Sequence, residues 1–335
     1  MDFILDFGLR LITQLQSPTI GFLIGGMLLA AFGSKLTIPS AIYQFIVFML
    51  LMKIGLKGGM EIRNAELSDM FLPLIFATLI GIIIVLAGNF IFSLIKSIKR
   101  VDGIATAGLF GAVSASTLAA AIVLLEEEAI IFEAWVPALY PFMDIAALVL
   151  AIVLANIHSK KQNDANDEKV DYWSIVKDSL RGSALSALIL GLILGLVTNP
   201  ERVFDSFYEP LFRGFLSILL LIMGMEAYER LHELKRVAHV YVLYAFIAPI
   251  IHGLLAFGLG FIAHHLVGFS PGGVVLLAVM AASSSDISGP PTLRSAIPTA
   301  NPSAYIGSST SVGTPVAIAV CIPLFISLAQ IVFNI

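Results

Sequence analysis

Two stretches of the sequence place glycine and hydroxyl side chains inside otherwise apolar runs. The first stretch carries Gly108, Gly111, Ser114, Ser116 and Thr117. The second carries Ser283, Ser284, Ser285, Asp286, Ser288, Gly289, Pro290 and Pro291. Such residues interrupt helices, and a helix that restarts inside a bilayer presents free N–H groups and about half a positive charge at its N-terminus. Because neither stretch contains lysine, arginine or histidine, backbone dipoles and hydroxyls would hold a small anion there.

The same regions also offer oxygen ligands that suit a hard cation such as sodium. Asp286 lies within the second stretch, and Asp144 lies near the centre of an apolar run at 133–157. A charged side chain at the centre of a bilayer costs about 2.5 kcal/mol or more, so it commonly has a partner or a function. We expect both aspartates to bind sodium. The alternative is that the small residues allow close helix packing and that the aspartates make structural hydrogen bonds.

The elements that position these residues are membrane spans. The chain has 335 residues, of which 58% are hydrophobic and 13% are charged, about half the charged share of a soluble domain. Apolar runs of roughly 17–25 residues, long enough to cross a bilayer as helices, recur along it. We predict ten such segments in an all-α integral membrane protein: 17–33, 38–56, 71–95, 103–124, 133–157, 183–198, 210–229, 239–266, 271–291 and 304–333. For residues 301–306 we expect a solvated loop that grades into the start of a helix.

The ten segments form two halves, 1–157 and 181–335, joined by a polar linker at 158–180. The first and sixth segments are short and carry Gly-xxx-Gly steps, Gly21 to Gly25 and Gly191 to Gly195. The fourth and ninth segments contain the two interrupted stretches. Because each half has an odd number of spans, the second half enters the membrane from the opposite side. This order predicts a 5+5 inverted repeat, which is common in secondary transporters.

Charge placement predicts the orientation. Lysines and arginines gather on the side that holds 158–180, which places this linker in the cytoplasm and both termini outside. We expect Met1–Gln16 to be an interfacial helix, Lys53 and Lys57 to extend to the membrane surface, and Glu126–Glu128 to form a solvated turn. The single cysteine, Cys321, excludes a disulfide within the chain.

Several of these stretches resemble one family of transporters. Residues 281–294, AASSSDISGPPTLR, are similar to the signature of the cyanobacterial sodium-dependent bicarbonate transporters, and so are residues 300–309, ANPSAYIGSS. In the first half, 48–56 (FMLLMKIGL) and 138–144 (ALYPFMD) also resemble this family. The resemblance covers essentially the whole chain.

The resemblance implies a sodium–bicarbonate symporter of the plasma membrane that serves carbon concentration. It implies core and gate domains, a homotrimer and inhibition by a cytoplasmic PII-like protein that senses adenine nucleotides. The 158–180 linker is shorter than this family leads us to expect, which weakens the expectation of regulation. The implied bicarbonate ligands are Gly111, Ser114, Ser283, Ser284 and Ser285. The implied sodium ligands are Ser116, Thr117, Asp144, Asp286 and Ser288.

Sodium coupling has a physical reason, since a monovalent anion entering a negative-inside cell pays about 2.3 kcal/mol per 100 mV. The alternatives are a sodium/proton antiporter, a sodium-coupled transporter of another small anion, a passive channel and an intramembrane enzyme. No Gly-x-Ser-x-Gly, His-Glu-x-x-His or Gly-x-Gly-Asp motif supports an enzyme. We expect no organic cofactor.

Overall fold

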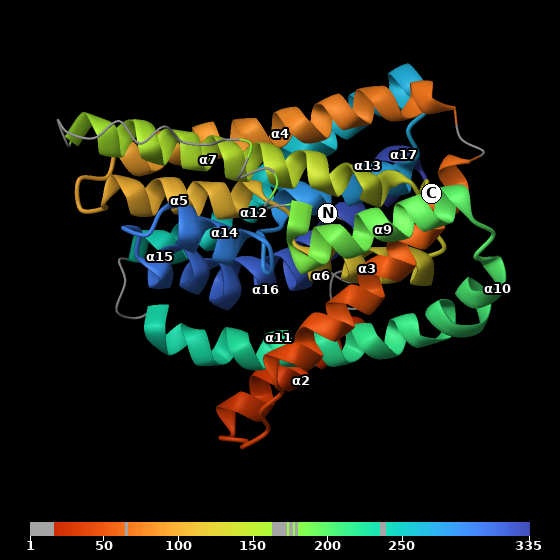
Figure 1. Ribbon diagram of the computed structural model, residues 1–335, viewed down its shortest axis with the longest axis horizontal. Helices are drawn as coiled ribbons and strands as arrows, with labels where there is room; N and C mark the ends of the chain where they lie inside the picture. Colours follow the sequence, from red (N-terminus) through yellow and green to blue (C-terminus); the bar gives the residue numbers. More distant parts are fainter. Residues whose placement is uncertain (1–16, 64–65, 163–172, 174–176, 178–179, 235–238) are drawn as a thin grey trace, which may run out of the picture.

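The computed structural model describes the chain apart from residues 1–16, 64–65, 163–172, 174–176, 178–179 and 235–238. The predicted interfacial helix at 1–16 and most of the 158–180 linker therefore lie outside the described residues. Every regular element in the described part is helical (Figure 1).

Helices occupy all ten predicted positions. The first half comprises α2 (Pro18–Ala31), α3 (Ser40–Ile62), α4 (Leu67–Ser93), α5 (Arg100–Gly111), α6 (Ala115–Glu127), η1 (Val136–Leu139) and α7 (Tyr140–Gln162). The second half begins with α9 (Ser183–Val197), α10 (Glu201–Val203), η2 (Phe204–Tyr208), α11 (Glu209–Leu234) and α12 (His239–Val267). It continues with α13 (Pro271–Ala282), α14 (Gly289–Ala296), α15 (Pro302–Ser308), η3 (Ser309–Gly313), α16 (Thr314–Val316), η4 (Ala317–Cys321) and α17 (Ile322–Phe333).

Six spans in the described residues are long and apolar enough to cross a membrane, so the chain is a multi-pass membrane protein. They are Ser68–Ser93, Arg100–Glu127, Val136–Ser159, Glu201–Leu231, His239–Val267 and Pro302–Phe333. The most apolar window of Arg100–Glu127 is 100% buried, whereas that of Ser68–Ser93 is 33% buried. The span that contains the first interrupted stretch is therefore enclosed by the others, and α4 lies at the periphery.

Local sequence explains where several helices start. Ser17 caps α2 by accepting a hydrogen bond from the N–H of Ile20, and Pro18 follows at the first helical position. Ser270 and Pro271 begin α13 in the same way, with the N–H of Gly273 as the donor. A serine cap followed by proline satisfies one free N–H and removes another, which favours a helix start.

The two halves pair their helices in the same pattern. The first helix of each half packs against the second helix of the other, α2 against α11 and α9 against α3. Within each half, the third helix packs on the start of the interrupted one, α4 on α5 and α12 on α13. We call α2, α3, α9 and α11 the four-helix group, which includes the short α10 and η2 that run into α11, and we call the other helices the larger bundle. In Figure 1, α2 crosses α11 at the lower edge of the view, while α4 and α7 lie at the upper edge.

Glycines permit the close packing of the four-helix group. A Cβ at Gly59 of α3 would collide with the carbonyl of Leu192 on α9, and one at Gly195 with the carbonyl of Leu56. In α2, however, Gly21 and Gly25 have open space around them, and Gly26 makes the contact with α11. The Gly-xxx-Gly step of the first segment therefore lies beside the helix interface, which Gly26 forms.

A cluster of charges between the four-helix group and α6 surrounds a buried Lys53, which corrects the expectation for this residue. Its side chain is 1% exposed, and its Nζ lies 3.1 Å from Glu209 of α11 and 3.8 Å from Glu126 of α6. The ammonium also lies 4.0 Å from the ring centroid of Phe212. Lys53 therefore does not extend to the surface. Glu126 is not a free solvated turn residue, because it also pairs with Lys57 at 3.7 Å.

Candidate functional site

Both interrupted stretches are breaks in helices. Helix α5 ends at Gly111, Ala112 and Ser114 are extended, and α6 begins at Ala115. Ser114 caps the restarted helix, since its Oγ accepts a hydrogen bond from the N–H of Thr117 at 3.1 Å. This cap explains why the helix resumes after only three residues.

The second break is longer. Helix α13 ends at Ala282, Ser283 is extended, and α14 begins at Gly289 with prolines in its first turn. The Oγ of Ser285 accepts a hydrogen bond from the N–H of Gly289 at 2.9 Å. Prolines lack an N–H, so the start of α14 leaves few donors unpaired.

The two breaks are in direct contact. The N–H of Ser114 donates to the Oγ of Ser283 at 2.9 Å, and the N–H of Ser285 donates to the carbonyl of Leu109 at 3.0 Å. Backbone groups released by one broken helix are thus partly satisfied by the other. Non-helical backbone at membrane depth is tolerated only where it finds such partners or a watery cavity.

Asp286 lies at the N-terminus of α6. Its Oδ2 accepts a hydrogen bond from the Oγ of Ser114 at 3.1 Å and another from the hydroxyl of Ser116. Its Oδ1 has no hydrogen-bond partner among the described residues. The sequence led us to expect a pocket without full charges at this helix end. Instead, the chain's own carboxylate occupies the position that favours an anion.

Asp144 connects both breaks. Its Oδ1 accepts a hydrogen bond from the N–H of Val113 at 3.0 Å, and its Oδ2 accepts one from the Oγ of Ser288 at 3.2 Å. The side chain is fully buried. Asp144 lies in the second turn of α7, counted from Tyr140, within the span Val136–Ser159.

A third polar stretch, from the last span, contacts the second break. The hydroxyls of Ser284 and Ser309 lie 2.7 Å apart, at the start of a π-helical segment, η3. The hydroxyls of Ser311, in η3, and of Thr314, which follows it, are buried without partners in the described part of the chain. The solvated loop predicted to grade into a helix at 301–306 is shorter than expected. Asn301 and Pro302 are exposed, but the helix already begins at Pro302 and Tyr305 is fully buried.

Of the ten predicted ligands, seven fall into two hydrogen-bonded groups that lie side by side at the breaks. Ser114, Ser116, Ser283 and Asp286 form the first group, and Asp144, Ser285 and Ser288 form the second. Ser284 faces Ser309. Thr117 donates its N–H to Ser114, and its Oγ1 is buried with no partner in the described residues.

Gly111 has a packing role, because a Cβ there would lie 2.8 Å from Val85 and 3.0 Å from Ala147. Its assignment to the substrate stays a prediction.

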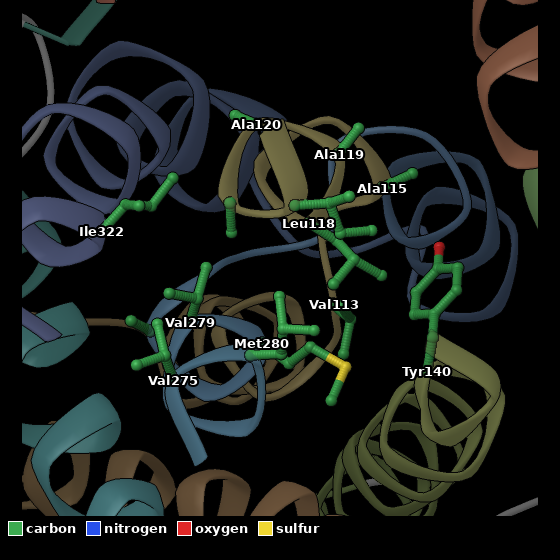
Figure 2. Packing of buried hydrophobic residues seen from close by; sticks show 14 of the residues in the cluster. Val113, Ala115, Leu118, Ala119, Ala120, Tyr140, Val275, Val279, Met280 and Ile322 are labelled. Carbon is green, nitrogen blue, oxygen red and sulfur yellow. The ribbon is translucent and has the colours of Figure 1, made fainter. Parts of the chain in front are cut away.

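Sequence reasoning missed Tyr140, which packs beside the first break. This residue is fully buried, and its hydroxyl has no partner among the described residues. The signal in the sequence is its position one helical turn before Asp144, which places both on one face of α7. Figure 2 shows Tyr140 in an apolar layer with Leu118 of α6 and Met280 of α13.

The donor set fits sodium as a transported ion. Asp286 Oδ1 and Thr117 Oγ1 are buried oxygens without partners in the described part. Carboxylate and hydroxyl oxygens are the ligands that hard cations prefer. The network therefore has spare oxygen ligands on the same helix start that holds the Asp286 carboxylate.

Comparison with known proteins gives the family. The model of the Na+-dependent bicarbonate transporter superfamily matches residues 18–330. No curated protein matches the chain. The match spans both breaks and nearly the whole sequence. The chain therefore belongs to the Na+-dependent bicarbonate transporter superfamily, with bicarbonate and sodium as its substrates.

Proposed function

We propose that this transporter is a symporter, which takes up bicarbonate together with sodium by alternating access. Membership in the family supports the two substrates. The observation that carries the coupling is the position of Asp286, whose Oδ2 is bound at the start of α6 while its Oδ1 has no partner in the described residues.

Sodium binding changes the net charge at the start of α6 and therefore its affinity for an anion. With Asp286 ionised there, a bicarbonate ion at the same helix end meets a negative charge. Two such charges about 4 Å apart repel by about 4 kcal/mol at an effective dielectric constant of 20. A sodium ion on Asp286 and the hydroxyls of Ser116 and Thr117 offsets this repulsion. Bicarbonate then binds well only after sodium, which couples the two fluxes.

The remaining predicted ligands complete the two sites. Ser114, Ser283, Ser284 and Ser285 donate to bicarbonate in this proposal, through hydroxyls and backbone N–H groups. Asp144 and Ser288 add sodium ligands, since Ser288 already donates to Asp144. Because the N–H of Ser114 is bonded to Ser283, bicarbonate must replace this contact between the breaks. Substrate binding thereby changes how the two broken helices meet.

The moving parts in this proposal are the two helix groups defined above. The larger bundle, which holds both breaks, acts as the core, and the four-helix group acts as the gate. The shared pairing pattern of the two halves supports an inverted repeat of 1–157 and 181–335 around the linker 158–180. Alternating access is then a movement of the core against the gate.

The setting in the cell is also proposed from the family resemblance. It comprises a homotrimer in the plasma membrane, with both termini outside and the 158–180 linker in the cytoplasm. Bicarbonate uptake would serve carbon concentration, and a PII-like nucleotide-sensing protein would bind the cytoplasmic face.

The test is uptake of labelled bicarbonate into proteoliposomes with and without an inward sodium gradient. Symport predicts bicarbonate accumulation that requires the gradient and labelled sodium uptake that requires bicarbonate. A sodium/proton antiporter would instead acidify or alkalinise the lumen on sodium addition without any bicarbonate requirement. Bicarbonate flux unaffected by sodium removal would contradict symport and indicate a passive channel.

A further inference from the structure

We propose that the groove between α4 and α12 binds an anionic phospholipid of the surrounding membrane. One acyl chain lies in the groove, and the phosphate lies at the basic loop that follows α4.

The groove is apolar and lies between two of the spans that are long enough to cross a membrane. It has a volume of about 330 Å³, within the range of roughly 300–1,000 Å³ for small-molecule pockets. Ile83 and Ile91 of α4 form one wall, and Leu243, Ile247 and Ile251 of α12 form the other. These side chains are 40–59% exposed, so the groove opens to the outside of the bundle, where hydrocarbon surrounds a membrane protein.

One end of the groove carries a cluster of positive charge. Ile95 lines the groove and is followed at once by Lys96, then by Lys99 and Arg100. Lys96 and Lys99 are exposed, and none of the three cations forms an ion pair within the described chain. The loop after α4 lies against the start of α12, because Ile98 packs against the apolar cluster that contains Phe92 of α4 and Tyr241 of α12.

This arrangement matches one class of molecule. An aliphatic slot that ends at several cations complements an acyl chain joined to a phosphate. Basic sites at the membrane surface attract anionic lipids by about 1 kcal/mol per lysine or arginine. A second copy of this chain would match the aliphatic walls, but the three cations would need acidic partners on that copy.

The groove is connected to the first break through one side chain. Tyr244 lines the groove, and its ring packs 4.7 Å from Phe92 and 5.3 Å from Phe110, measured between centroids. Phe110 immediately precedes Gly111, the last residue of α5. A bound acyl chain therefore supports the aromatic packing that holds the end of α5 in place.

The experiment is native mass spectrometry of the purified full chain with phosphatidylglycerol or phosphatidylcholine. We expect phosphatidylglycerol to bind on the order of 100-fold more tightly, because each of the three cations adds the charge contribution above. The triple variant Lys96→Gln/Lys99→Gln/Arg100→Gln should bind both lipids equally. Ala87→Trp, which fills the groove from an exposed position of α4, should reduce binding of both.

The matched controls are Lys35→Gln, an exposed lysine of another loop, and Ala31→Trp, an exposed alanine at the end of α2. Neither should change lipid occupancy. Equal binding of the two lipids by the unmodified chain would overturn the proposal, as would an unaffected triple variant. If Ala87→Trp lowers the oligomeric mass and leaves lipid occupancy unchanged, the groove is an interface between copies instead. No arm of the test depends on transport, so its failure would leave the proposed symport untouched.

Discussion

Ser114 donates its backbone N–H to the hydroxyl oxygen of Ser283 over 2.9 Å, although 169 positions separate the two residues. The bond joins the break of one half to the break of the other. Any movement of bicarbonate between the breaks must lengthen or replace it, so this contact is a direct place to test the proposed substrate site.

Ser283→Ala should weaken bicarbonate binding. The substitution removes a proposed hydroxyl donor to bicarbonate, and a hydrogen bond to a charged group contributes about 1.5–3 kcal/mol. The half-saturating bicarbonate concentration should rise roughly 5-fold or more. Initial uptake rates in proteoliposomes at saturating sodium measure this. Ser217→Ala, which removes an exposed hydroxyl that bonds only within α11, should leave the kinetics unchanged. Unaltered bicarbonate kinetics in Ser283→Ala would remove this hydroxyl from the substrate site.

Asp286→Asn should reduce the response to sodium more than it reduces the amount of folded protein. The amide keeps the shape of the side chain but lacks the charge that binds sodium in our proposal. Interactions with a charged group contribute about 1.5–3 kcal/mol, so the half-saturating sodium concentration should rise on the order of 10-fold or more. Bicarbonate uptake across a sodium series measures it, with Asp69→Asn at the exposed start of α4 as the control. A sodium dependence equal to that of the unmodified protein would exclude Asp286 as a ligand.

The sequence predicted the positions of the helices and of both breaks because their signals are local. Apolar runs of membrane-spanning length locate the spans, and the two prolines at 290 and 291 locate the start of α14. The partners across the breaks have no local signal. Which serine meets Ser114 depends on how α5 and α13 pack, a property of the folded bundle.

The errors also have a physical cause. Successive residues of a helix point about 100° apart, so a glycine one position along faces another neighbour. The sequence pattern alone therefore does not identify Gly26, rather than Gly21 or Gly25, as the glycine that packs against α11. Lys53 was misjudged because its acidic partners, Glu126 and Glu209, come from distant parts of the chain.

Loss of the partner of Lys53 should destabilise the fold more than loss of Lys53 itself. Glu209→Gln leaves a buried ammonium with only the longer contact to Glu126, whereas Lys53→Met fills similar space without a charge. The apparent melting temperature in detergent should fall by several degrees in Glu209→Gln and less in Lys53→Met. The double variant should recover part of the loss. If Glu209→Gln melts like the unmodified protein, the ion pair contributes nothing to stability.

Gly59→Ala should disrupt the packing of α3 against α9. The added methyl group would collide with the carbonyl of Leu192, a backbone atom that cannot turn aside, and overpacking of this kind costs about 1–3 kcal/mol. Thermal unfolding in detergent should show the loss. Gly25→Ala is the matched control, because open space surrounds Gly25 and alanine favours a helix over glycine by about 1 kcal/mol. The two alanine variants should therefore shift the melting temperature in opposite directions. Equal shifts would mean that α3 and α9 do not approach as closely as their glycines indicate.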